Sequence, residues 1–169
     1  MSEREKVDLA ESVVSLLKEN KLTIATAESC TGGMLGARLI DVPGVSEVFI
    51  VGHITYANEA KMEVLGVLEE SLLQYGAVST VVAKEMVEGL IQSSHGKVGI
   101  SITGIAGPGG GTAEKPVGTV FMGCHVCGKT TVKGYLFTGN RATIREKAVQ
   151  EALILLQQCI LESIAANQI

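Results

Sequence analysis

The sequence predicts an α/β fold, a three-layer α/β/α sandwich built around a mixed sheet of about five strands. Short apolar and β-branched runs alternate with segments of helical apolar spacing, which is typical of strands joined by crossover helices. Two late runs, 117–126 and 130–137, are separated by only three residues and predict an antiparallel hairpin, so the sheet is expected to be mixed. The sequence shows no internal repeat or linker, and we expect a single domain over residues 1–169.

Periodicity and turn residues predict the elements in order. We expect a helix over 7–19, a strand over 22–27, a helix over 34–40, a strand over 47–56, short helices over 58–65 and 69–75, a longer helix after residue 79, a strand over 98–103, the hairpin, and a final helix over 142–164. Asn58 and Ser79 are expected helix N-caps, and Asn20 and Gly76 are expected to end helices. Gly52, inside a strand, marks either a bulge or a close approach of two backbones.

Composition narrows the possible functions. The chain has 14 Lys and Arg against 18 Asp and Glu, a net charge of −4, whereas nucleic-acid-binding domains usually have a basic excess. Aromatic residues make up 4% and Trp is absent, which disfavours a base-stacking surface. No apolar run approaches the roughly 20 residues of a membrane helix, and no apolar segment follows the charged N-terminus as in a signal peptide. We therefore expect a cytoplasmic protein without nucleic-acid or membrane partners.

The stretch 26–33 (TAESCTGG) is the strongest candidate for chemistry. A buried strand ends there and a helix follows, so a hydroxyl and free backbone N–H groups meet at a helix N-terminus. That arrangement suits a nucleophile beside an oxyanion site, and we take Ser29 as the nucleophile. The rival nucleophile is Cys30, whose other role is packing beneath the turn. Glu28 is either a base or a surface carboxylate. The N–H groups from Cys30 to Gly33 are expected to bind the anion, which brings in Thr31 and Gly32.

Lys61 is the candidate base, because no His is placed to complete a Ser-His-Asp triad. It lies in the first turn of the helix expected after Asn58, where the positive end of the helix disfavours the ammonium form. A basic lysine must be neutral, which needs a pKa lowered to about 7–8. Tyr56 could orient Lys61 or relay its proton. The alternative is a solvated surface lysine and a strand-end tyrosine.

Two further segments hold small or polar residues where strands meet loops. The glycine-rich loop 103–111 includes Thr103, Gly104 and Gly107 and could cover a ligand or bind phosphate, although it lacks the Gly-Lys-Ser/Thr of a Walker A loop. Arg141 suits a phosphate. Sites in open α/β sheets gather beyond the carboxyl ends of strands, so Ser29, Tyr56 and Thr103 are expected to converge on one rim.

The four cysteines do not suggest a metal or disulfide framework. Cys124 and Cys127 form a C-x-x-C pair, but no second pair of Cys or His completes a zinc site. We interpret the two as strand residues near a hairpin, and in a cytoplasmic chain the thiols are expected to be reduced.

Taken together, these stretches resemble the CinA C-terminal family over nearly the whole chain. The matching stretches are 26–33 (TAESCTGG), 55–61 (TYANEAK), 76–79 (GAVS), 103–110 (TGIAGPGG), 115–119 (KPVGT) and 139–141 (GNR). The resemblance implies an amidase that converts nicotinamide mononucleotide to nicotinate mononucleotide and ammonia, with a Ser/Lys pair at Ser29 and Lys61 assisted by Tyr56. It implies no metal and no cofactor, and it makes a homodimer an expectation.

Two positions depart from the usual family pattern. Asn140 stands where an Asp commonly precedes the arginine, and His53 stands where a small or β-branched residue is usual. The alternative function is a nucleotide-binding or regulatory module of the same fold that does no hydrolysis.

Overall fold

The computed structural model describes residues 3–169, with side chains from residue 9 onward. Its sheet has five strands in the order β2-β1-β3-β4-β5. The strands are β1 (Ile24–Glu28), β2 (Phe49–Ile54), β3 (Val98–Gly104), β4 (Thr119–Val126) and β5 (Lys129–Leu136). β1 runs parallel to both of its neighbours, whereas β4 and β5 are antiparallel, so the mixed sheet predicted from the sequence is confirmed.

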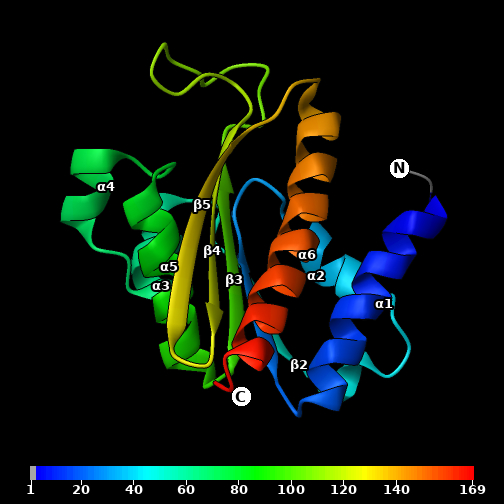
Figure 1. Ribbon diagram of the computed structural model, residues 1–169. Helices are drawn as coiled ribbons and strands as arrows, with labels where there is room; N and C mark the ends of the chain where they lie inside the picture. The colour runs from blue at the N-terminus through cyan, green and yellow to red at the C-terminus, as the bar shows by residue number, and fades with distance from the viewer. Residues whose placement is uncertain (1–2) are drawn as a thin grey trace.

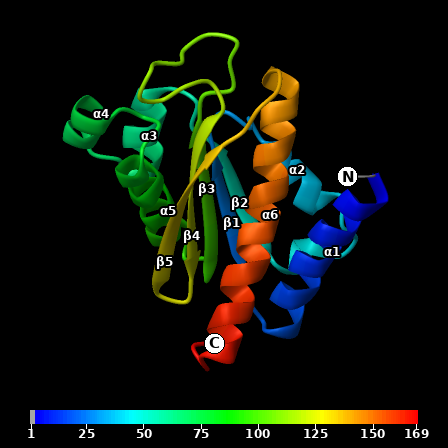
Figure 2. The ribbon, with the colours of Figure 1, turned by 45° about the horizontal axis from the view of Figure 1, so that its top comes forward.

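Helices cover both faces of the sheet, which completes the three layers (Figure 1). One face carries α1 (Glu3–Glu19), α2 (Met34–Ile40) and α6 (Arg141–Ala165), and the other carries α3 (Asn58–Leu65), α4 (Glu69–Tyr75) and α5 (Thr80–Ser94). Figure 2 shows α6 lying along the sheet with α1 and α2 beside it. Each face has its own apolar cluster; Ile24 belongs to the α6 side, and its neighbour Ala25 belongs to the α5 side.

Residues of β1 alternate between the two clusters because successive side chains of a strand point to opposite faces. All five residues of β1 are buried. A strand that is central, parallel to both neighbours and covered on both faces gives its C-terminal end a fixed position. The residue that follows this strand is Ser29.

The segment before β2 differs from the sequence prediction. A 3-10 turn (Val45–Glu47) occupies what was expected to be the start of the strand. The bulge lies at Ile50, because Ile24 pairs with Phe49 and Ala25 pairs with Val51. At Gly52 the close neighbour is a side chain and not a second backbone, since a Cβ atom there would lie 2.8 Å from Thr26 Oγ1.

The expected end residues are partly confirmed. Asn20 lies at the end of α1, where its side-chain amide donates to Leu16 O at 2.8 Å, and Ser79 caps α5 by accepting from Val82 N. The expected N-cap at Asn58 is wrong by one residue. Ala57 is the N-cap of α3 and Asn58 is its first helical residue, so the Asn58 side chain is free to face the neighbouring loop.

The hairpin turn has two residues rather than the three expected. Val126 pairs with Lys129, and Cys127 and Gly128 both have positive φ, 46° and 93°. Positive φ at both central residues is the requirement of a type I′ turn, which matches the twist of the flanking strands.

Within the described part of the chain, α6 is long and apolar enough to pass a length-and-composition test for a membrane span. Its inner residues, among them Ile144, Leu153 and Leu156, are buried in the cluster between α6 and the sheet. The apolar character of α6 is therefore used in packing the core.

Candidate active site

A cavity of about 180 Å³ lies where the C-terminal ends of β1 and β3 meet the segment that follows β2. It is lined by Ser29, Cys30, Tyr56, Asn58, Lys61, Ala77, Val78, Thr103, Gly104, Ala106 and Arg141. Seven of these residues were site candidates from the sequence. The rim predicted from strand ends is therefore present, and it includes Ser29, Tyr56 and Thr103.

Ser29 is the first residue of the turn that leaves β1. Its N–H donates to Ile102 O of β3 at 2.9 Å, so the backbone is still held by the sheet where the hydroxyl emerges. Its carbonyl oxygen accepts from Gly32 N at 3.0 Å, which closes a tight turn. Gly33 has a φ of 96° and is the N-cap of α2. A side chain at that φ is strained, which accounts for a glycine there.

Glu28 is neither of the alternatives considered from the sequence. Its side chain is buried, and its two oxygens accept from Leu35 N at 2.9 Å and Gly36 N at 3.0 Å. A carboxylate at a helix N-terminus satisfies unpaired N–H groups and is favoured by the helix dipole. Glu28 thus caps α2 and ties it to the end of β1.

Lys61 is buried, with 1% of its surface exposed, so the reading of a solvated lysine is wrong. Its Nζ lies 3.1 Å from Ser29 Oγ. The same nitrogen donates to the carbonyl oxygens of Thr55 at 2.7 Å and Tyr56 at 3.2 Å. Those carbonyls belong to the segment that joins β2 to α3, so the ammonium or amine group is held by backbone atoms on the side away from Ser29.

Burial lowers the pKa of Lys61, and the nearby Cys30 thiol acts in the opposite sense to a smaller degree. Burial removes water from the charged form and so favours the neutral amine. No carboxylate is among the hydrogen-bond partners that the described residues give Nζ. The pKa of Lys61 is thus shifted in the direction that a lysine acting as a general base requires.

The segment that carries Lys61 is anchored to β1. Thr55 N donates to Glu28 O at 2.9 Å, which extends the β1–β2 ladder by one bond beyond the end of the strand. The carbonyl of the same residue then accepts from Lys61 Nζ. The distance between Lys61 Nζ and Ser29 Oγ is thus set by the pairing of two strands.

Most backbone N–H groups near Ser29 already have acceptors. Gly32 N bonds to Ser29 O, Met34 N bonds to Thr31 O, and the next two amides bond to Glu28. Among the described residues, no oxygen atom accepts from the N–H groups of Cys30, Thr31 and Gly33, and the N–H of Cys30 interacts with its own thiol. Among the four predicted anion-binding residues, only Cys30 lines the cavity, and Thr31, Gly32 and Gly33 do not.

Cys30 is unsuited to be a nucleophile at neutral pH. Its side chain is 5% exposed and belongs to the α6-side core cluster. Burial raises the pKa of the thiol to about 11, so the expected lowering by a helix N-terminus does not occur. Packing beneath the turn, the other role considered from the sequence, fits this environment, because a Cβ atom at Gly104 would meet Cys30 Sγ at 3.1 Å.

Tyr56 and Arg141 form the outer edge of the cavity. Arg141 donates from Nη2 to the Tyr56 hydroxyl at 3.1 Å and from Nη1 to Gly107 O at 2.8 Å. The Tyr56 side chain is exposed, and its hydroxyl contacts Arg141 instead of Lys61; only its backbone carbonyl reaches the lysine. Arg141 therefore joins the loop after β2 to the glycine-rich loop.

Thr103 and Gly104 form the β3 side of the cavity. Thr103 Oγ1 donates to Ala77 O at 2.9 Å, which fixes the segment before α5 against the end of the strand. Gly107 contributes its carbonyl to Arg141 but does not line the cavity. Asn58, Ala77 and Val78 were not singled out as site residues from the sequence. Because Ala57 and not Asn58 is the N-cap of α3, the Asn58 side chain is not used in capping and can line the cavity.

Arg145, one turn along α6, was also missed by sequence reasoning. Its Nε donates to Cys30 O at 2.9 Å and its Nη2 donates to Thr31 O at 3.1 Å. Only the spacing from Arg141, four residues and so the same helix face, could have drawn attention to it.

The two departures from the family pattern lie outside the cavity lining. Asn140 caps α6 by accepting from Thr143 N at 2.9 Å, a role that an Asp fills equally well. His53 is half-buried on the edge strand β2.

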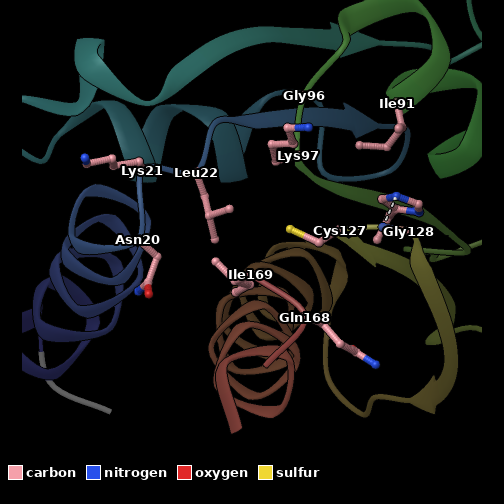
Figure 3. A pocket seen from close by; sticks show the side chains of 11 residues that line it. Asn20, Lys21, Leu22, Ile91, Gly96, Lys97, Cys127, Gly128, Gln168 and Ile169 are labelled. Atoms are coloured by element: carbon pink, nitrogen blue, oxygen red, sulfur yellow. Dashed lines mark hydrogen bonds between the residues drawn. The ribbon is translucent and has the colours of Figure 1, made fainter. Parts of the chain in front are cut away.

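A larger cavity, about 570 Å³, lies at the opposite end of the sheet (Figure 3). It is lined by residues that precede β1 and β3 and by the hairpin turn, including Leu22, Lys97 and Cys127. His125 lies on its wall, with Nε2 accepting from Gly128 N and Nδ1 bonded to Thr130 Oγ1, and burial lowers its pKa. The imidazole is thus neutral, and both of its ring nitrogens are already hydrogen-bonded to residues of the hairpin. Among residues that the structure describes, no group of three His, Cys, Asp or Glu could hold a metal ion.

The fold and the site together define a three-layer α/β protein with a buried serine–lysine pair beyond the carboxyl ends of its parallel strands. Comparison with known proteins gives the family. The model of the CinA C-terminal domain matches residues 6–160, and the chain belongs to that family.

Relatives and solved structures agree with this assignment. A protein from Clostridium botulinum (strain Okra / Type B1), provisionally named as a competence-damage inducible protein, is 52% identical over 150 residues, which cover 89% of this chain and 37% of the relative. A CinA-like protein from Kosmotoga olearia is 50% identical over 153 residues, covering 90% and 37%. The chain thus spans little more than a third of these relatives.

Two crystal structures have the same fold over nearly their whole length. The competence/damage inducible protein CihA from Agrobacterium tumefaciens has a TM-score of 0.87 and 38% identity, with 89% of this chain and 93% of that chain covered. A competence-damaged protein (CinA) superfamily protein from Escherichia coli has a TM-score of 0.89 and 36% identity, with 94% and 93% covered.

Proposed function

We propose that the protein is an amidohydrolase that converts nicotinamide mononucleotide to nicotinate mononucleotide and ammonia, with Ser29 as nucleophile and Lys61 as general base. The observation that carries the proposal is the buried 3.1 Å contact between Lys61 Nζ and Ser29 Oγ. A serine hydroxyl is a weak nucleophile until an adjacent base takes its proton. The substrate comes from the resemblance of this site to the CinA C-terminal family.

The hydrogen bonds of Lys61 suit the neutral amine. A primary amine has two hydrogens and one lone pair, and the two carbonyls of Thr55 and Tyr56 accept the two hydrogens. The lone pair is then left for the Ser29 hydroxyl hydrogen. Proton transfer from Oγ to Nζ accompanies attack of Oγ on the carboxamide carbon, and the carbonyl π electrons move to oxygen.

The tetrahedral intermediate collapses when the carbon–nitrogen bond breaks. Lys61 returns its proton to the leaving nitrogen, and ammonia departs. A water molecule, deprotonated by the same amine, then attacks the acyl-enzyme and restores Ser29. The N–H of Cys30, the one residue of 30–33 that lines the cavity, is the candidate oxyanion donor; the loss of one such donor typically costs about 3–4 kcal/mol of transition-state stabilisation.

The size of the cavity indicates which part of the nucleotide it holds. At about 180 Å³ it is smaller than a typical small-molecule pocket, which starts at about 300 Å³. We infer that it encloses the carboxamide and pyridinium ring, and that ribose and phosphate lie along the edge formed by Tyr56 and Arg141. The guanidinium can offer two parallel donors to a phosphate once it leaves its present partners.

The test is an ammonia-release assay with nicotinamide mononucleotide, nicotinamide riboside and free nicotinamide. We expect turnover of the mononucleotide, loss of turnover in Ser29→Ala, and a fall of at least about 100-fold in Lys61→Met. Lys84→Met, which removes an exposed lysine on α5, is the matched control and should behave as wild type. Turnover of Ser29→Ala at the wild-type rate would reject the assigned nucleophile. Calorimetric binding of the mononucleotide without ammonia release would favour the non-catalytic module.

A further inference from the structure

Arg145 is the one arginine of α6 that reaches the backbone of the nucleophile turn. It leaves the helix one turn after Arg141 and places Nε 2.9 Å from Cys30 O and Nη2 3.1 Å from Thr31 O. Its side chain does not line the cavity, so it is not in a position to touch a substrate there. The contact connects a helix on one face of the sheet to the two residues that follow Ser29.

Each of these hydrogen bonds fixes the orientation of a whole peptide group. The Cys30–Thr31 peptide is trans, and in a trans peptide the C=O and the N–H point in opposite directions. A bond from Arg145 to Cys30 O therefore directs the N–H of Thr31 away from α6. The preceding peptide is held in the same way, because Ser29 O accepts from Gly32 N, and the N–H of Cys30 has no oxygen acceptor among the described residues.

We propose that Arg145 is a positioning residue for the reaction proposed above, and that it holds the turn after Ser29 so that the N–H of Cys30, which lines the cavity, faces the developing oxyanion. The proposal rests on the proposed function for its chemistry and on the two hydrogen bonds for its geometry. Preorganised N–H groups stabilise a transition state only when their direction is set in advance. The turn contains two glycines, and without an external anchor its peptide planes have more freedom to rotate.

The charge of Arg145 acts in the same direction as its hydrogen bonds. Its guanidinium favours the anionic form of the neighbouring Cys30 thiol, and the same field favours an oxyanion formed at Ser29. A lysine at this position keeps the positive charge, but it lacks the planar fork that holds two carbonyls at once. Substitution by lysine or by methionine can therefore separate the effect of the positive charge of Arg145 from the effect of its two hydrogen bonds.

The variants are Arg145→Met, Arg145→Lys and the control Arg38→Met. Arg38 lies on α2 and contacts Glu146, so its loss removes an arginine from the same helical layer without touching the turn. Pyridine-3-boronic acid is the probe, because serine adds to boron and forms a tetrahedral anion that resembles the intermediate. Its inhibition constant does not depend on the fraction of active protein.

For Arg145→Met we expect kcat for nicotinamide mononucleotide to fall by about 100-fold, with KM changed by less than about threefold, as when an oxyanion donor is lost. The boronate inhibition constant should rise by the same factor as kcat/KM falls. Arg145→Lys should retain an intermediate rate and Arg38→Met the wild-type rate. A KM effect alone, or boronate affinity equal to wild type, would overturn the proposal.

A measurement independent of turnover separates this inference from the proposed function. In a nitrogen-15 NMR spectrum, the Thr31 amide resonance should move in Arg145→Met and stay in place in Arg38→Met. If wild type releases no ammonia but the Thr31 resonance moves, the proposed amidase is wrong and the positioning contact stands. If the Thr31 resonance does not move in a folded Arg145→Met protein, Arg145 does not fix the orientation of the Cys30–Thr31 peptide, and the proposal is wrong.

Discussion

The carboxylate of Glu28 accepts the N–H of Gly36 at 3.0 Å across the start of α2, and its second oxygen accepts the neighbouring amide of Leu35. The last residue of the nucleophile strand is therefore also the cap of the next helix. The turn at 29–33 is therefore held in place by a fully buried contact between the Glu28 carboxylate and two backbone amides of α2.

Glu28→Gln should lower the free energy of unfolding by about 1.5–3 kcal/mol, because the neutral amide has one acceptor where two charge-assisted bonds existed. Chemical denaturation followed by circular dichroism measures the change. Glu47→Gln is the control: Glu47 is 69% exposed in an ion pair with Lys18, and its loss should change stability by less than about 1 kcal/mol. Equal effects of the two changes would contradict the capping role.

The lowered pKa of Lys61 predicts a pH dependence of stability. In the window between its folded pKa and the unfolded value of about 10.4, the unfolded chain binds a proton that the folded protein does not. The free energy of unfolding should therefore rise with pH across that window, by at most about 1.4 kcal/mol per unit. Lys61→Met removes this contribution, so the stability difference between wild type and variant should change with pH.

Cys30 should resist alkylation although it lines the cavity. With the pKa raised to about 11, only about one thiol in a thousand is ionised at pH 8, and the thiolate is the reactive form. Cys127 lies in the exposed hairpin turn and is only half-buried. Iodoacetamide followed by peptide mass spectrometry should find Cys127 modified well before Cys30. Rapid labelling of Cys30, together with loss of ammonia release in Cys30→Ala, would reopen the case for a cysteine nucleophile.

Arg141 should affect substrate binding more than the chemical step. It lines the cavity and contacts Tyr56 and Gly107, and it has no hydrogen bond to Ser29 or Lys61 among the described residues. For Arg141→Met we expect KM for nicotinamide mononucleotide to rise by about 10-fold or more with kcat little changed, since phosphate binding is equal in ground and transition states. The unphosphorylated riboside should show no such rise. A fall in kcat for both substrates would place Arg141 in the chemical step.

Gly52→Ala should be destabilising by about 1–3 kcal/mol, because the new Cβ atom would lie 2.8 Å from Thr26 Oγ1 in a closely packed strand pair. Gly109→Ala is the matched control, since a Cβ atom there meets nothing within 4 Å. Thermal unfolding of the two variants gives the comparison. A neutral Gly52→Ala would show that β2 can move away from β1 at little cost.

Much of the fold follows from local pattern. The buried run before Ser29, the apolar face of α5 and the hairpin were all visible as periodicity, which depends on neighbouring residues only. The predicted details that were wrong are those that depend on single hydrogen bonds. Ala57 replaces Asn58 as the cap of α3, and the bulge lies at Ile50 instead of Gly52.

The site was predictable where strand ends bring residues together. Ser29 and Lys61 could be paired because parallel neighbouring strands end at the same edge of a sheet. The contacts of Glu28 and Arg145 were not predictable, since each joins a side chain to backbone groups whose direction is known only in the folded chain. Burial agrees with the expected lowering of the Lys61 pKa and reverses the expected lowering of the Cys30 pKa, because it makes the thiol a weaker acid.

The bond from Thr55 N to Glu28 O has a consequence for motion in the protein. β2 has a neighbour on one side only, and a strand at the margin of a sheet separates more easily than a central one. Opening of that margin would break the bond to Glu28 and loosen the two carbonyls that hold Lys61 Nζ. Water reaching the lysine would favour its charged form, so the proposed pair depends on a closed margin.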